Sequence, residues 1–174
     1  MKIHRINNIP VPHIGMRIWK TVIAVFLSAL SGYIFNYNPF YTIITSILCM
    51  QVSTEASLKT AGVRCIGTFI GGIFSALMLV VINIFSIEIF SIAYYIIISL
   101  FVAPMIYITV LIHREKSAFI TCVVFFSVVL VNIVRMNPYL FIVLRVIETL
   151  AGIGISVAVN MIIKNPDKKN SGTV

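Results

Sequence analysis

Two arginines open the same polar pattern in two stretches of the sequence that are otherwise apolar. The pattern is Arg, Ile, Thr, Gly and Ser, and each residue of the second copy stands 81 positions after its counterpart: Arg64, Ile66, Thr68, Gly71 and Ser75, then Arg145, Ile147, Thr149, Gly152 and Ser156. Arg, Thr, Gly and Ser fall at i, i+4, i+7 and i+11, which is one face of an α-helix. The chemistry that such a face predicts is the binding of an anion by its arginine.

The charged residues of this pattern allow two interpretations each. An arginine in the middle of a membrane span costs roughly 2.5–3.5 kcal/mol on insertion scales, so it normally faces protein or water and has a function. Arg145 fits that description, although it could also reach outward, and Arg64 could equally serve to set the topology. Glu148, three residues after Arg145, is either its structural partner or a proton-coupling carboxylate. The structural pair is the preferred interpretation.

The small residues of both copies have a simpler explanation. Membrane helices approach each other closely where glycine or serine lies at the interface. This packing role is expected for Gly67, Gly71, Ser75, Gly152 and Ser156.

Composition determines the fold class. Of the 174 residues, 60% are hydrophobic and 10% are charged, and the mean hydropathy is +1.07. A soluble domain has about 25% charged residues, so this chain has too little polar surface to cover a water-soluble core. Its charges cluster in short breaks between long apolar runs. At roughly 20 residues a span, the pattern predicts an all-α, polytopic membrane protein with six transmembrane helices and no separate soluble domain.

The breaks place these helices at about residues 16–37, 40–52, 63–84, 87–112, 117–134 and 139–163. The second is short for a span, so it is expected to extend over 53–56 or to be shielded by neighbours. Arg17, Trp19 and Lys20 at the start of the first helix suit the headgroup layer. Residues 1–15 are expected to form a cytoplasmic or interfacial segment, 16–163 the transmembrane domain and 164–174 a short cytoplasmic tail.

Basic residues predict the orientation. Eleven of the 13 Lys and Arg residues lie on one side of the six expected helices, whereas Arg135 lies on the other side and Arg145 within a helix. The positive-inside rule then places both termini in the cytoplasm of an inner or plasma membrane. Because the net charge of +8 flanks the spans, it indicates topology and not nucleic-acid binding. Helices 63–84 and 139–163 would start on opposite sides, so the two three-helix halves are predicted to be inverted repeats, as in many transporters.

Enzymatic function is not expected. The sequence has no HExxH pair, nucleophile elbow or phosphate-binding glycine loop. Its three cysteines show no CxxC spacing, so neither a disulfide framework nor a metal site is predicted. No cofactor is predicted either.

Three segments carry a resemblance to a known family. Residues 15–21 read GMRIWKT, residues 50–59 read MQVSTEASLK, and residues 64–71 read RCIGTFIG. Together they resemble the aromatic acid exporter family, also called fusaric-acid-resistance-like (FUSC) proteins, and the resemblance covers about residues 15–163. The plant aluminium-activated malate channels are similar in organisation.

This resemblance implies a six-helix unit that exports aromatic or other organic carboxylates. It also implies a homodimer in the lipid bilayer, with Arg64 and Arg145 attracting the anion. Gln51, Thr68 and Thr149 would donate hydrogen bonds to it. Family relatives usually continue into a cytoplasmic domain, whereas this sequence stops at Val174. The alternative hypothesis is therefore a non-transporting assembly or accessory subunit of a larger complex, which would purify with a partner.

Overall fold

The protein is helical throughout the part that a computed structural model describes, residues 16–133 and 137–163. The elements are α1 (Met16–Phe35), α2 (Phe40–Cys49), α3 (Thr54–Phe85), α4 (Ile92–Leu111), the 3-10 turn η1 (Glu115–Ser117), α5 (Ala118–Phe126), the π-helix η2 (Ser127–Asn132) and α6 (Pro138–Ile162). The prediction of an all-α protein with six helices is confirmed. The segments expected at 1–15 and 164–174 lie outside the described residues.

Fewer helices than expected have the length of a membrane span. Within the described residues, α1, α3, α4 and α6 are long and apolar enough to cross a bilayer. Helix α2 has only 10 residues, or about 15 Å at 1.5 Å a residue, which is half of a hydrocarbon core. Helix α5 has 9 residues and continues into the 6 residues of η2. The fold is therefore a multi-pass membrane protein with four candidate spans and two shorter helices.

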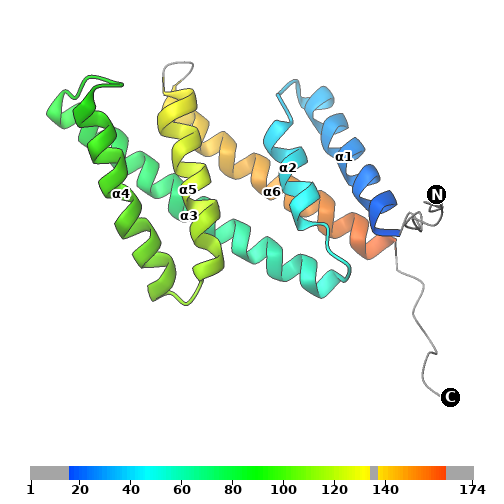
Figure 1. The fold of residues 1–174 in the computed structure, drawn as a ribbon. Coiled ribbons are helices and arrows are strands. Elements are labelled where there is room, and N and C mark those ends of the chain that lie inside the picture. The colour runs from blue at the N-terminus through cyan, green and yellow to red at the C-terminus, as the bar shows by residue number, and fades with distance from the viewer. Residues whose placement is uncertain (1–15, 134–136, 164–174) are drawn as a thin grey trace, which may run out of the picture.

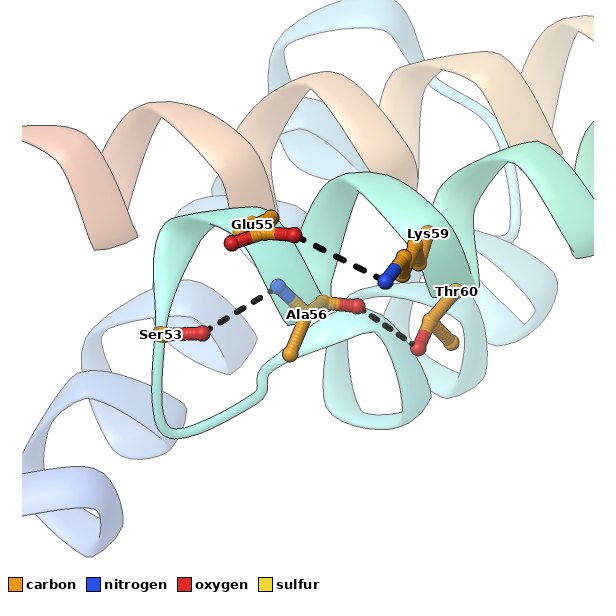
Figure 2. A network of polar contacts seen from close by, with 5 residues as sticks. All are labelled: Ser53, Glu55, Ala56, Lys59 and Thr60. Carbon is orange, nitrogen blue, oxygen red and sulfur yellow. Dashed lines mark hydrogen bonds and ion pairs between the residues drawn. The ribbon is translucent and has the colours of Figure 1, made fainter.

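The polar segment after α2 is not the extension of α2 that its short length suggested. Helix α2 ends at Cys49, and α3 already begins at residue 54, nine residues before the predicted start. Ser53 caps the new helix by accepting a hydrogen bond from the backbone N–H of Ala56 (3.2 Å), and Lys59 pairs with Glu55 one turn away (3.6 Å), as Figure 2 shows. Capping and i,i+4 pairing stabilise a helix start even among polar residues.

Helix α4, in contrast, begins later than expected, at Ile92 and not at residue 87. Ser91 is its N-cap and accepts a hydrogen bond from the backbone N–H of Tyr94 (3.2 Å). Apolar residues before the cap cannot satisfy the free N–H groups of a first turn, whereas a serine can.

The two longest helices, α3 and α6, form the centre of the fold. They pack against each other and run in opposite directions, because Ser57 near the start of α3 bonds to Asn160 near the end of α6. Helices α1 and α2 pack on α6, and α4 and α5 pack on α3 (Figure 1). The outer surface is strongly apolar, with Phe26 64% and Ile92 81% exposed, as expected for helices that face lipid.

The two ends of this arrangement have different interiors. Between α3, α4, α5 and η2 lies an apolar cluster made of Met78, Tyr94, Ile98, Met105, Phe125 and Val129. Between α1, α2, α3 and α6 the buried side chains are mostly small or polar, including Lys20, Ser28, Thr42, Thr45, Ser46, Ser57, Thr149, Ser156 and Asn160. Buried polar groups in a membrane protein usually mark a functional region, so a site is expected near the packing of α2 on α3 and α6.

Candidate functional site

A cavity of about 220 Å³ lies between α2 and α5, above the crossing of α3 and α6. We call it the arginine cavity, and its lining residues are Phe40, Tyr41, Ile44, Thr45, Leu48, Arg64, Thr68, Phe119, Ile120, Val123, Val124, Arg145 and Thr149. Four of the five residues predicted to bind an anion are therefore brought together: both arginines and both threonines. They come from α3 and α6, which place the two copies of the sequence pattern on opposite sides of one space.

The lining of the arginine cavity is made of matched positions. Arg64 and Thr68 of α3 have their counterparts 81 positions later in α6. The α2 residues have counterparts 79 positions later in α5, and the pairs are Phe40 with Phe119, Tyr41 with Ile120, Ile44 with Val123 and Thr45 with Val124. Only Leu48 lines the cavity without a partner of this kind. The two halves of the chain thus contribute almost equal shares.

Arg64 reaches the cavity from α3 and is held by α2. Its side chain is buried (9% exposed), and its Nη1 donates a hydrogen bond to Oγ1 of Thr45 (3.1 Å). A neutral hydroxyl orients the guanidinium but does not neutralise it, so the positive charge remains available to a ligand.

Arg145 enters from α6 and is also held by α2, through an aromatic ring. Its guanidinium carbon lies 3.3 Å from the ring centroid of Tyr41, a cation–π contact, and the residue is 7% exposed. The ring of Phe141 supports Tyr41 edge-on at 6.0 Å. Nε of Arg145 is buried and has no hydrogen-bond partner among the described residues.

Glu148 forms no direct ion pair with Arg145. Across residues 16–133 and 137–163, the ion pairs within 4.0 Å do not include these two side chains. Oε2 of Glu148 is buried without a hydrogen-bond partner in the same part of the chain. The two charges act on each other at longer range, so the preferred structural pair is not a direct contact, because an i,i+3 spacing permits a contact without requiring one.

Two predicted hydrogen-bond donors behave differently from expectation. Thr149 lines the arginine cavity, but its hydroxyl donates to the backbone oxygen of Arg145 (2.8 Å), and a hydroxyl has a single hydrogen to donate. Gln51 does not line the cavity at all. It lies in the connection between α2 and α3, where its side-chain amide donates to the oxygen of Leu48 (3.1 Å).

The sequence reasoning missed a buried lysine. Lys20, expected in the headgroup layer, is 2% exposed and donates from Nζ to Oδ1 of Asn160 (2.9 Å). The Asn160 amide in turn donates to Oγ of Ser57 (2.8 Å) and to the backbone oxygen of Gln51 (3.2 Å). We call these four residues the Lys20 cluster. A signal was present: the buried face of α1 is Lys20, Ala24, Ser28 and Gly32, a small-residue stripe at i+4 spacing.

The glycines of the pattern lie where α2 and α5 approach the central helices most closely. A Cβ on Gly152 would be 2.6 Å from the backbone oxygen of Thr42, and one on Gly71 would be 2.6 Å from that of Thr121. A Cβ on Gly67 would be 2.9 Å from the backbone oxygen of Ser117. No side chain larger than hydrogen fits at these separations.

The two serines of the pattern are fully buried, but they differ in their bonds. Ser75 donates to the backbone oxygen of Gly71 (2.8 Å). Ser156 has no hydrogen-bond partner for its hydroxyl among the described residues. An unpaired buried hydroxyl is costly, which sets Ser156 apart from an ordinary packing residue.

Comparison with known proteins identifies the family. The family model of aromatic acid exporter family member 1 matches residues 12–163. UPF0421 protein SSP0904 of Staphylococcus saprophyticus is 39% identical over 64 residues, which are 37% of this chain and 20% of that protein. The chain thus aligns with about a fifth of this relative's length. No solved structure shows a significant match. Over most of its length, and as its sequence motifs predicted, the chain belongs to the aromatic acid exporter family.

Proposed function

We propose that this chain is a membrane transporter that exports organic carboxylates and binds the carboxylate in the arginine cavity. One observation carries the proposal: two buried arginines line the same cavity, and none of its lining residues is acidic. Membership of an exporter family supports the transport function.

Electrostatics favour an anionic ligand at this position. A buried charge without a direct ion-pair partner is costly, and the hydrogen-bond and ring contacts of Arg64 and Arg145 are with the neutral side chains Thr45 and Tyr41. Glu148 acts on Arg145 only from beyond ion-pair distance. A carboxylate would offset one of the two positive charges and accept hydrogen bonds from both guanidinium groups, whose planar donors match its geometry.

The walls of the cavity favour a small acid with an apolar body. Tyr41 and Thr45, which hold the arginines, belong to α2, whereas the α5 wall consists of the apolar residues Phe119, Ile120, Val123 and Val124. A volume of about 220 Å³ is below the 300–1,000 Å³ of pockets for drug-sized ligands. A single-ring monocarboxylate would direct its charge to the arginines and its ring to the α5 wall.

The matched lining supports an arrangement of two inverted repeats, α1–α3 and α4–α6. The equivalent helices α3 and α6 run in opposite directions, since Ser57 meets Asn160 and Gly72 lies beside Ile142. In transporters with such repeats, the substrate site lies between the two halves. The basic residues favour cytoplasmic termini in an inner or plasma membrane.

A homodimer would complete the site. The rim of the cavity includes the side chains of Phe40, Leu48 and Phe119, which are 47–73% exposed. A second copy packed over α2 and α5 would cover this rim and separate the anion from lipid. The two short helices could then be shielded from the bilayer by protein on both sides.

The test is flux from proteoliposomes loaded with benzoate, an aromatic acid, or with malate, a dicarboxylic acid. Arg145→Ala should lower benzoate flux at least about tenfold, because it removes charged hydrogen bonds that contribute about 1.5–3 kcal/mol. Arg114→Ala is the matched control, since this exposed arginine lies outside the cavity, and it should keep wild-type flux. Repeating both assays with a pH gradient separates a coupled exporter from a channel.

The outcomes decide between the two functional hypotheses. Unchanged flux in Arg145→Ala would remove the arginine cavity from the transport path. Absence of flux for every acid in folded wild-type protein would instead favour a non-transporting accessory subunit.

A further inference from the structure

Lys20 is buried at a position from which it could easily reach the membrane surface. It lies one turn after the start of α1, and lysines near the ends of membrane helices usually extend their ammonium groups into the headgroup layer. Lys20 does the opposite, because its side chain turns into the protein and is 2% exposed, whereas Trp19 beside it is 58% exposed. A charged group placed inward at this cost is expected to have a function.

The described neighbours of Lys20 do not compensate its charge. An ammonium group has three N–H donors, and the described bond uses one of them, to the neutral amide oxygen of Asn160. The other members of the Lys20 cluster, Ser57 and Gln51, are neutral as well. Within the described ranges, no carboxylate forms an ion pair with Lys20.

A buried polar face of α6 connects the Lys20 cluster with the arginine cavity. The buried residues of α6 include Thr149, which lines the cavity, then Ser156, then Asn160, which bonds to Lys20. At 1.5 Å a residue, Ser156 lies about 10 Å beyond Thr149 and about 6 Å before Asn160 along the helix. Its unpartnered, fully buried hydroxyl lies between the two cationic groups.

We propose that Lys20 forms a second anion-binding site, which holds the carboxylate of the transported acid at the opposite end of α6 from Arg145. This inference rests on the proposed function, since the same acid would occupy both sites in turn. The carboxylate would accept hydrogen bonds from the two N–H groups of Lys20 that the described residues leave free. Ser156 would offer its hydroxyl on the way between the sites. At Gly152, α2 packs directly on α6, so passage would require α2 to move.

The experiment measures benzoate binding by calorimetry, and benzoate flux in proteoliposomes, with the full chain. Lys20→Met removes the charge, and Asn160→Asp places a carboxylate of the chain itself beside the ammonium. Both variants should bind one benzoate per chain where the wild type binds two, and both should lose about tenfold or more in flux, the effect of one charged hydrogen bond. Lys59→Met, an exposed lysine paired with Glu55, is the control and should behave as the wild type.

Asn160→Asp distinguishes a binding site from a structural tie. If Lys20 only holds α1 to α6, the new aspartate would keep that contact as an ion pair, although it loses the bonds that the amide donates to Ser57 and Gln51. Flux at the wild-type level would then overturn the proposal. The Asn160→Asp variant also tests the second anion-binding site if the Lys20→Met variant does not fold. Two bound benzoates in either variant would refute the second site alone, provided that Arg145→Ala still lowers flux as predicted above. Unchanged flux in Arg145→Ala would instead refute the proposed function on which this site rests.

Discussion

The contact of Gly152 with α2 makes a sharp prediction about packing. An alanine at this position would place its Cβ 2.6 Å from the backbone oxygen of Thr42 and 2.8 Å from Cβ of Thr45. Neither atom can rotate away, because one belongs to the α2 backbone and the other is fixed to it. The whole of α2 would therefore have to shift away from α6.

The magnitude follows from comparison with Gly154, in the same helix, whose added Cβ would meet nothing within 4 Å. Both substitutions gain the same intrinsic helix propensity, about 0.8–1 kcal/mol in water. This gain cancels when Gly152→Ala is compared with Gly154→Ala. What remains is the cost of overpacking, typically about 1–3 kcal/mol, so Gly152→Ala should be less stable than Gly154→Ala by that amount.

Equilibrium unfolding in mixed micelles titrated with SDS measures the difference directly. The same comparison can be made in α3, where Gly71→Ala meets the backbone oxygen of Thr121 at 2.6 Å and Gly62→Ala meets nothing within 4 Å. Equal unfolding free energies within both pairs would show that α2 and α5 do not approach the central helices as closely as described. Loss of stability at Gly71 without loss at Gly152 would refute the reasoning for the α2–α6 contact alone.

Two further predictions concern aromatic residues at opposite ends of the fold. Tyr41→Leu should raise the KM for benzoate flux by roughly twofold to thirtyfold, because a cation–π contact contributes about 0.5–2 kcal/mol. Tyr41→Phe keeps a ring over Arg145, so its KM should stay at the wild-type value. Equal KM values in both variants would contradict a positioning role for Tyr41. Tyr94→Phe should lower the free energy of unfolding by about 1–3 kcal/mol, because its buried hydroxyl donates to the backbone oxygen of Val129 in the π-helix η2. SDS titration against Tyr95→Phe, a half-exposed neighbour, checks this, and a wild-type KM is expected for Tyr94→Phe.

Much of the arginine cavity could be predicted because its key residues share a helical period. Arg64 with Thr68, and Arg145 with Thr149, lie on single faces of long helices, and period alone places such residues together. That α3 and α6 bring these faces to one cavity does not follow from period. It depends on tertiary packing, through glycines that let α2 and α5 approach from either side.

The remaining parts of the site depend on side-chain choices that a sequence pattern does not contain. Lys20 could extend to the headgroups or turn inward with equal covalent ease, and the hydrogen bond to Asn160, 140 positions away, decides between them. Gln51 was assigned to the anion path because of a family motif, but Ser57 and Asn160 hold its backbone in a different place. Long-range polar bonds of this kind are visible only in the folded chain.

The early start of α3 shows the same limit for secondary structure. Hydropathy marks where a helix enters the apolar layer, whereas Ser53 and the Glu55–Lys59 pair mark where its hydrogen bonds begin, one or more turns earlier. Both signals are present in the sequence, but they identify different boundaries. A helix of 32 residues is longer than a span requires, so its first turns carry charges beyond the apolar part.

The α2 and α5 walls of the arginine cavity match in position but differ in residue type. Tyr41 and Thr45 of α2 correspond to Ile120 and Val124 of α5, so equivalent positions have opposite chemistry. Both arginines therefore find their partners on α2, although they come from different halves of the chain. A cavity with equal walls could bind an acid in two orientations. If this cavity binds an organic acid as proposed, the arginines held by Tyr41 and Thr45 and the apolar residues of α5 would favour a single orientation, with the carboxylate at the arginines and the ring at α5.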